Sequence, residues 1–210
     1  MIDPGTNQDG ETVEAYCRRR WGGSGWTRSM ISSGKKDGAT FSDWKIWPHT
    51  LKAHQLVHYF ATKVPAANGD SDDGDSTSFF STDKVNQFLF QAEYERGENI
   101  SKIDTLVNIA KELLETNNNN NNNNQEIESI LRDLRNYLSQ NLGARDVQEE
   151  INLGRQRYRI SGVPYFIVGL AAESTESHGS EEYSSRRRPY GLSGAQSPQT
   201  FVEIFEELDE

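Results

Sequence analysis

The single cysteine, Cys17, is the first residue in this 210-residue sequence that could carry chemistry. One cysteine excludes an internal disulfide, a Cys-x-x-Cys redox pair and a cysteine-rich zinc site within these residues. Three arginines follow it directly, and their charges would lower the pKa of the thiol if they approached it. The surrounding pattern predicts a short helix, and we expect an incidental helix cysteine. The sequence therefore assigns no catalytic residue.

Three histidines, His49, His54 and His58, lie close together in a segment with helical periodicity. His54 and His58 are four residues apart, so they share one face of the predicted helix. Two histidines make only half of a typical metal site, and no third ligand is near them in the sequence. We therefore predict no metal site and expect His54 to be a structural residue of its helix.

Two glycine-containing segments have the spacing of ligand-binding loops. Gly22-Gly23-Ser24-Gly25 could cradle a phosphate, but no strand precedes it and no Lys-Ser or Lys-Thr pair follows it. The segment 68–75 has the Asp/Asn-x-Asp/Asn spacing of calcium loops, but the glutamate required at the twelfth position is absent. We interpret the first segment as the end of a helix and the second as a polar loop.

Charge and composition limit the classes of partner. The chain has 32 acidic and 22 basic residues, which gives a net charge of -10 and disfavours binding to nucleic acid or to an anionic membrane. Hydrophobic residues make up 34% and aromatic residues 10%, which is enough for a folded core. No apolar run reaches the length of a membrane span, and the first residues do not resemble a secretion signal. The expected location is cytoplasmic.

The spacing of apolar residues predicts a mostly helical chain. Helices are expected over 11–21, 26–32, 48–61, 82–95, 103–114, 127–138 and 144–157. Polar or low-complexity loops are expected at 64–78, at the eight asparagines of 117–124, and at 171–188. The first residues, Met1-Ile2-Asp3, run into an Asp-Pro-Gly turn and look like the end of a strand whose start is missing.

The pattern changes near the carboxyl terminus. Residues 162–169 are β-branched and aromatic, which predicts a strand buried on both faces. A second, short strand is predicted at 190–194. Ser197-Pro198 then starts a terminal helix, whose predicted buried face consists of Phe201, Ile204, Phe205 and Leu208.

Four segments, taken in order, resemble the DsbA family of the thioredoxin superfamily. Gly162-Val163-Pro164 before a strand resembles the proline loop of the superfamily. The other three segments are Trp47-Pro48-His49-Thr50-Leu51-Lys52-Ala53-His54, Leu89-Phe90-Gln91-Ala92-Glu93-Tyr94, and Gly191-Leu192-Ser193-Gly194 with the helix that follows it. The closest branch is the FrnE-like proteins, which are related to 2-hydroxychromene-2-carboxylate isomerases and kappa-class glutathione transferases.

The resemblance implies a thioredoxin-like α/β fold with a large helical insertion between its second and third strands. Residues 1–10 would be a remnant of the second strand and its turn. Residues 11–158 would be the insertion, and 159–210 the carboxy-terminal thioredoxin half. The family's reactive Cys-x-x-Cys, or its lone Ser or Cys in the isomerase and transferase branches, has no counterpart here. The first strand and first helix of the fold are therefore expected to be missing.

The resemblance also implies a substrate-binding site. A cis bond before Pro164 would leave the backbone of Val163 free to pair with an extended substrate, and His49 and Thr50 would line the facing groove. The resemblance implies a protein of the thiol–disulfide oxidoreductase class that uses no cofactor. Its substrate would be a protein or small molecule that contains a thiol or a disulfide. These residues are expected to be inactive as written, because the reactive Cys-x-x-Cys is absent. The alternatives are an isomerase or transferase that uses glutathione, and a non-catalytic peptide-binding module.

Overall fold

The computed structural model describes residues 3, 5–64, 80–117, 124–170 and 189–209. Within them the chain is mixed α/β, with mostly helical segments and two small antiparallel sheets. It divides into two compact units, Ile2–Gln148 and Glu149–Glu210. The division lies inside one helix, about ten residues before the predicted start of the thioredoxin half.

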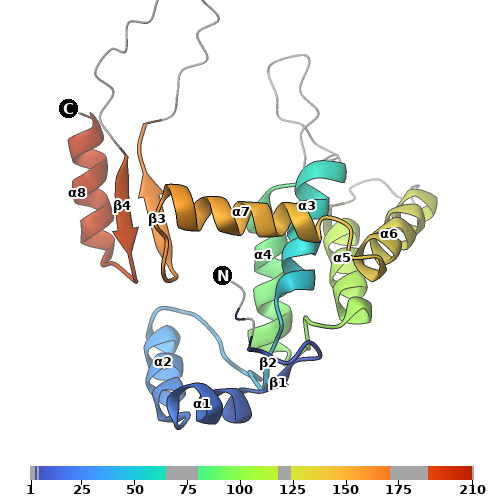
Figure 1. Cartoon of the computed structure of the whole chain (residues 1–210), viewed down its shortest axis with the longest axis horizontal. Helices are drawn as coiled ribbons and strands as arrows, with labels where there is room; N and C mark the ends of the chain where they lie inside the picture. Colours follow the sequence, from blue (N-terminus) through green and yellow to red (C-terminus); the bar gives the residue numbers. More distant parts are fainter. Residues whose placement is uncertain (1–2, 4, 65–79, 118–123, 171–188, 210) are drawn as a thin grey trace, which may run out of the picture. The chain divides into compact units, whose positions relative to one another are not determined.

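The larger unit holds most of the helices (Figure 1). Its elements in chain order are β1 (Glu11–Thr12), α1 (Val13–Trp21), α2 (Gly25–Lys36), β2 (Ile46–Trp47), α3 (Leu51–Lys63), α4 (Thr82–Phe90), the π-helix η1 (Gln91–Glu95), α5 (Ile103–Asn117), α6 (Asn124–Ser139) and the start of α7 (Ala144–Arg157).

The main hydrophobic core lies among α3, α4, α5 and α6. These helices carry apolar residues at three- and four-residue spacings, so each presents one apolar stripe to its neighbours. The largest side chains that are fully buried there are Leu56, Phe60, Leu106, Ile109, Leu113, Leu134 and Leu138. The packing of α5 beside α6 and of α3 beside α4 can be followed in Figure 1.

Polar side chains of α3 bind one carbonyl in the last turn of α6 and one in the turn that follows it. The Lys52 ammonium donates to the Leu138 carbonyl (2.9 Å), and the Gln55 amide donates to the Leu142 carbonyl (2.8 Å). The last carbonyls of a helix have no partner inside it, so such side chains supply bonds that the helix cannot make itself. This contact fixes the end of α6 on α3.

A second, aromatic cluster lies around α1 and the small sheet β1–β2. Glu11 pairs with Trp47 and Thr12 with Ile46 in antiparallel register. The Tyr16 and Trp47 rings are stacked with centroids 4.0 Å apart. The sheet therefore holds residues 46–47 beside α1, and residues 46–47 lead into α3.

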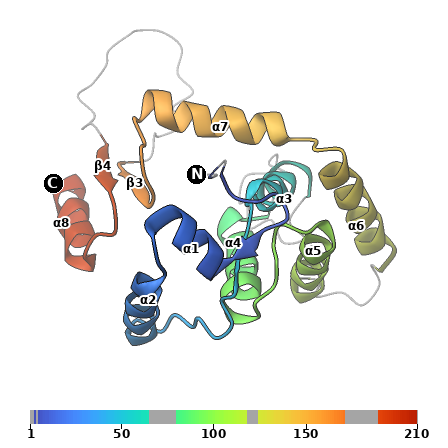
Figure 2. The ribbon, with the colours of Figure 1, turned by 60° about the horizontal axis from the view of Figure 1, so that its bottom comes forward.

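The smaller unit contains β3 (Tyr165–Val168), β4 (Tyr190–Ser193) and α8 (Pro198–Asp209), as Figure 2 shows. The two strands pair antiparallel, with Phe166 opposite Leu192. The Phe166 ring packs edge-on against Phe201 of α8, with centroids 5.0 Å apart. One face of the hairpin is thus covered by the terminal helix.

Both predicted strands and the terminal helix are confirmed, but β3 is not buried. Ile167 is 47% exposed, and the other three residues of the strand are half-buried. The physical reason is that α8 covers one face of the hairpin, at Phe166, whereas Ile167 has no covering layer among the described residues of this unit. On α8, Ile204 and Leu208 are buried, whereas Phe205 is 53% exposed, contrary to its predicted position on the buried face.

Several predicted helix boundaries were wrong, including the start of α3, which is Leu51 instead of residue 48, and the end of α5, which is Asn117 instead of residue 114. Glu11–Thr12 form a strand, and the Thr12 hydroxyl caps α1 by accepting from the Ala15 amide (3.1 Å). Helix α2 continues to Lys36 instead of ending near residue 32, through a glycine that propensity disfavours inside a helix. The predicted 82–95 helix changes at Gln91 to a π-helical turn.

Some predictions lie outside the described residues. They concern residues 1–2 of the strand remnant, residues 65–78 of the loop predicted at 64–78, and the whole loop predicted at 171–188. Of the asparagine loop predicted at 117–124, residues 118–123 lie outside the described residues, whereas Asn117 belongs to α5 and Asn124 to α6. In the part of the chain that the structure does describe, no helix is both long and apolar enough to cross a membrane.

Candidate functional site

The Val163-Pro164 peptide bond is cis, as predicted from the proline-loop resemblance. Val163 is 65% exposed, and Pro164 directly precedes β3. The Pro164 carbonyl accepts from the Gly194 amide (2.9 Å), which extends the β3–β4 ladder by one bond. The loop is therefore anchored on the β4 side, while Val163 stands out from the hairpin.

The other edge of β3 is open among the described residues, because β4 is the only strand that pairs with β3 there. Over the same described ranges, no backbone hydrogen bond involves Val163. Alternate N–H and C=O groups of such an edge can pair with an added strand. The geometry can thus accept an extended peptide beside Val163 and β3.

His49 and Thr50 lie between β2 and α3 in the larger unit. The His49 amide donates to the Ser101 hydroxyl (2.8 Å), and the Ser101 amide in turn donates to the Asn99 side-chain oxygen (3.0 Å). Thr50 is the residue before the first turn of α3, and its carbonyl accepts from the His54 amide (2.9 Å). Both side chains are half-buried.

These contacts hold the His49 backbone and leave its imidazole without a hydrogen bond to another described residue. The Ser101 hydroxyl, two residues before α5, is thus engaged by the His49 amide. The predicted site residues form two pairs, one in each compact unit. That they line one common groove stays a prediction.

Cys17 is fully buried in the aromatic cluster of α1. Burial raises the pKa of its thiol and outweighs a hydrogen bond with Trp26 that lowers it. The arginines that follow it do not lower the pKa. An attacking sulfur must be an accessible thiolate, so Cys17 has neither property that a nucleophile needs.

The histidines of α3 have separate surroundings. His54 is exposed, whereas His58 Nδ1 lies 3.0 Å from the Tyr137 hydroxyl and its Nε2 lies 4.0 Å from an Asp146 carboxylate oxygen. Across the described residues, no group of three or more His, Cys, Asp or Glu side chains is placed to hold a metal ion. Tyr137 is buried, and this Tyr–His–Asp chain connects α6, α3 and α7.

The sequence reasoning missed a buried acid, Glu93, in the π-helix η1. It is 6% exposed, and burial raises the pKa of its carboxyl to about 8. Desolvation disfavours the charged form, so this carboxyl is mostly protonated at neutral pH. The available signal was its position beside Ala92 within the apolar stripe of the segment 85–94.

No protein-family model matches this sequence, and no similar chain was found among the curated proteins. The functional assignment therefore depends on the residues and their geometry.

Proposed function

We propose that this chain is a DsbA-like, thioredoxin-fold protein of the thiol–disulfide oxidoreductase class, and that its 210 residues supply substrate binding. The observation that carries the proposal is the β3–β4–α8 unit with an exposed Val163 before an open strand edge. An antiparallel hairpin followed by a helix is the arrangement that the resemblance to the DsbA family implies for the second half of the fold.

The substrate would bind as an added strand. Its backbone would pair with the N–H and C=O of Val163, and its side chains would contact exposed apolar residues such as Ile167. In thiol–disulfide exchange, a thiolate attacks one sulfur of a disulfide, and the other sulfur leaves as a thiolate. The role assigned to this unit is to hold the disulfide-bearing chain in position for such an attack.

A non-catalytic peptide-binding module is the second candidate, and the state of Cys17 favours it. The only cysteine of the sequence is buried and has a raised pKa. These residues therefore cannot cycle between a dithiol and a disulfide by themselves. Both candidates require the same strand-pairing contact at Val163, and they differ in whether an attacking thiolate acts on the bound chain.

Binding of a fluorescein-labelled, carboxymethylated insulin B chain to the full protein tests the shared contact by fluorescence anisotropy. Val163→Pro removes the N–H donor, whereas Val163→Ala keeps it and shortens only the side chain. We expect the proline variant to bind about tenfold more weakly, because losing a net hydrogen bond and the strand geometry costs about 1.4 kcal/mol or more. The alanine variant should stay within about twofold.

Amide hydrogen exchange gives a second readout that does not depend on how the variants fold. In the wild-type protein, the Val163 amide should exchange more slowly when the peptide is added, because a strand-pairing bond protects it. Absence of binding, equal losses in both variants, or unchanged exchange at Val163 would each contradict the proposal. Both candidates predict that these residues bind a disulfide-containing peptide without reducing it, because the only cysteine is buried.

A further inference from the structure

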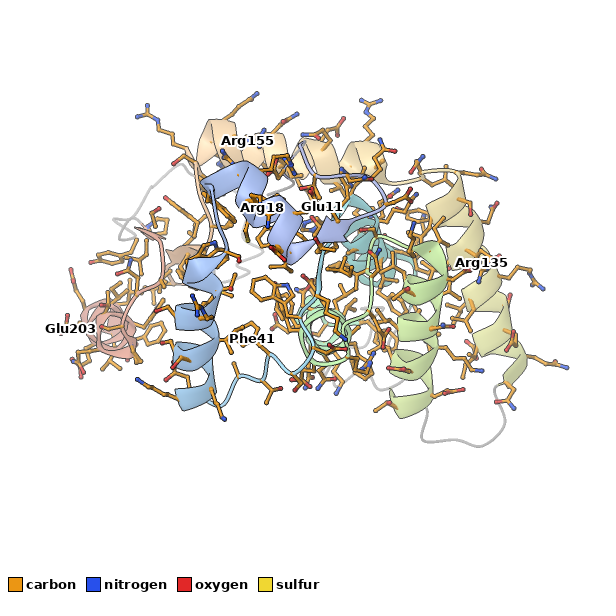
Figure 3. The ribbon with its side chains drawn as sticks, turned by 90° about the horizontal axis from the view of Figure 1, so that it is seen from below. Glu11, Arg18, Phe41, Arg135, Arg155 and Glu203 are labelled. Carbon is orange, nitrogen blue, oxygen red and sulfur yellow. The ribbon has the colours of Figure 1, made fainter. Side chains whose placement is uncertain are left out.

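A cleft of about 760 Å³ lies within the larger unit, between α2 on one side and α4 with η1 on the other. We call it the α2–α4 cleft. Its aromatic lining residues are Phe41, which follows α2, Phe90 from α4 and Tyr94 from η1. Figure 3 labels Phe41, whose ring lies between α2 and α4 in that view.

The aromatic walls of the cleft are held in place by neighbouring contacts. The Phe41 and Tyr94 rings meet edge-on with centroids 5.4 Å apart, and Trp44 packs against both rings. The Phe41 ring also lies so close to α2 that a Cβ on Gly34 would come within 2.6 Å of it. Gly34 therefore allows the ring to approach the helix backbone.

The position of Phe90 differs from that of the other two rings. It is 58% exposed, and its centroid lies 5.9 Å from that of Tyr94. A large aromatic side chain this exposed on a helix adds nothing to the core that Leu89 and its neighbours form. Its ring is available to a ligand that enters the cleft.

The charged groups of the cleft are all acidic. Asp83 at the start of α4 and Glu95 at the end of η1 line it, and both are exposed. Neither makes an ion pair with another described residue, although Glu95 interacts electrostatically with the neighbouring Arg96, which forms ion pairs with Glu98 and Glu112. The described lining contains no Lys, Arg or His, and its remaining polar side chains are the neutral Thr40, Asn86, Gln87 and Gln91.

We propose that the α2–α4 cleft binds a small organic cation of the alkylammonium class. Ring faces attract a cation through their quadrupole, and this attraction is the basis of aromatic cages for quaternary ammonium groups. The two unpaired carboxylates add Coulomb attraction at the cleft rim. An anionic ligand would meet two like charges and no Lys, Arg or His among the described lining residues, so the charge pattern disfavours it.

The cleft is independent of the β3 edge and of the thiol chemistry proposed above. Every residue that lines it belongs to the larger unit, whereas Val163 belongs to the smaller one. Failure of peptide binding at Val163 would leave the cation proposal intact, and the reverse also holds.

Titration of the full protein with choline, followed by nuclear magnetic resonance shifts, tests the proposal. The matched neutral probe is 3,3-dimethylbutan-1-ol, which has nearly the same shape and no charge. We expect choline to bind at least about fivefold more tightly, since one exposed cation–π contact alone is worth roughly two- to fivefold. The shifts should be centred on Phe41, Phe90 and Tyr94.

Variants separate the two sources of attraction. Phe90→Leu and Glu95→Gln should each weaken choline binding by roughly two- to fivefold. The control for the first variant is Phe205→Leu, because Phe205 is also exposed and lies outside the cleft. The control for the second is Glu128→Gln, which replaces an exposed acid on α6. Neither control should change the affinity for choline. Raising the salt concentration should weaken choline binding and leave the alcohol unaffected.

Three results would overturn the proposal. The first is equal affinity for choline and the alcohol. The second is shifts centred away from the cleft, and the third is no saturable choline binding up to about 50 mM. Phe90 is exposed, so its replacement should leave the fold intact, and the wild-type comparison of the two probes requires no variant.

Discussion

A Gly143→Ala substitution should destabilise the larger unit far more than the same substitution at Gly22. Both glycines have φ of +76°, in the left-handed region that alanine adopts at a cost of about 1–2 kcal/mol. The two glycines differ in how much room a side chain would have. A Cβ at Gly22 would meet nothing within 4 Å, whereas a Cβ at Gly143 would lie 1.7 Å from the Tyr137 hydroxyl oxygen.

The steric conflict between the new Cβ and Tyr137 determines how much more stability is lost at Gly143 than at Gly22. Tyr137 is 5% exposed and packs on Tyr59 with centroids 5.1 Å apart, so its ring has little room to move. Displacing it would break the bond between its hydroxyl and His58, worth about 0.5–1.5 kcal/mol. Repacking the buried ring adds about 1.5 kcal/mol. We therefore expect Gly143→Ala to cost about 2–3 kcal/mol more than Gly22→Ala.

Chemical unfolding of the full chain, followed by circular dichroism at the helix band, measures both losses. The difference corresponds to roughly 4–12 °C in Tm for a chain of this size. Tyr137→Phe in the Gly143→Ala background should recover part of the loss, because the atom nearest to the new Cβ is removed. Equal losses at the two glycines would refute the reasoning, because they would show that strain at positive φ accounts for the whole effect.

Three further predictions follow from buried and exposed groups. Burial raises the pKa of Glu93 from 4.5 to about 8, so the carboxyl ionises first in the unfolded chain, and the free energy of unfolding should fall as the pH rises from about 4.5 to 8. Glu93→Gln should flatten this dependence of stability on pH. An unfolding free energy with the same pH dependence in both proteins would contradict the prediction. The buried Cys17 should react with a thiol reagent only on the timescale of unfolding, and the chain should show no insulin reduction above background; fast labelling of the native protein would refute the burial. The open edge of β3 should promote self-association, so Ile167→Lys should lower it in light-scattering measurements, whereas Val202→Lys on α8 should have little effect.

Local patterns were enough to predict most elements of this chain. The stripe from Ile127 to Leu138 predicted α6, and the β-branched run after Pro164 predicted β3. A stripe is a property of neighbouring residues, so it can be found without knowing what covers it. The helix end at Gly22 was found in the same way, and its amide donates to the Arg18 carbonyl (3.0 Å).

The candidate site was predicted only in part. The proline loop had a recognisable signature, and the bond before Pro164 has the predicted conformation. The α2–α4 cleft had no such signature, because Phe41 and Phe90 are far apart in the sequence and line one cleft only in the folded chain. The burial of Glu93 could not be predicted from the sequence.

The sequence by itself determined the helical character, the order of the elements and the limits on chemistry. One cysteine and a net charge of -10 hold whatever the fold is. The tertiary structure decided which of these residues are exposed. Cys17 is buried with a raised pKa, Ile167 lies open, and Glu93 is removed from water. The physical reason is that burial depends on which elements pack together over long separations in the chain, and burial sets both pKa and access to a ligand.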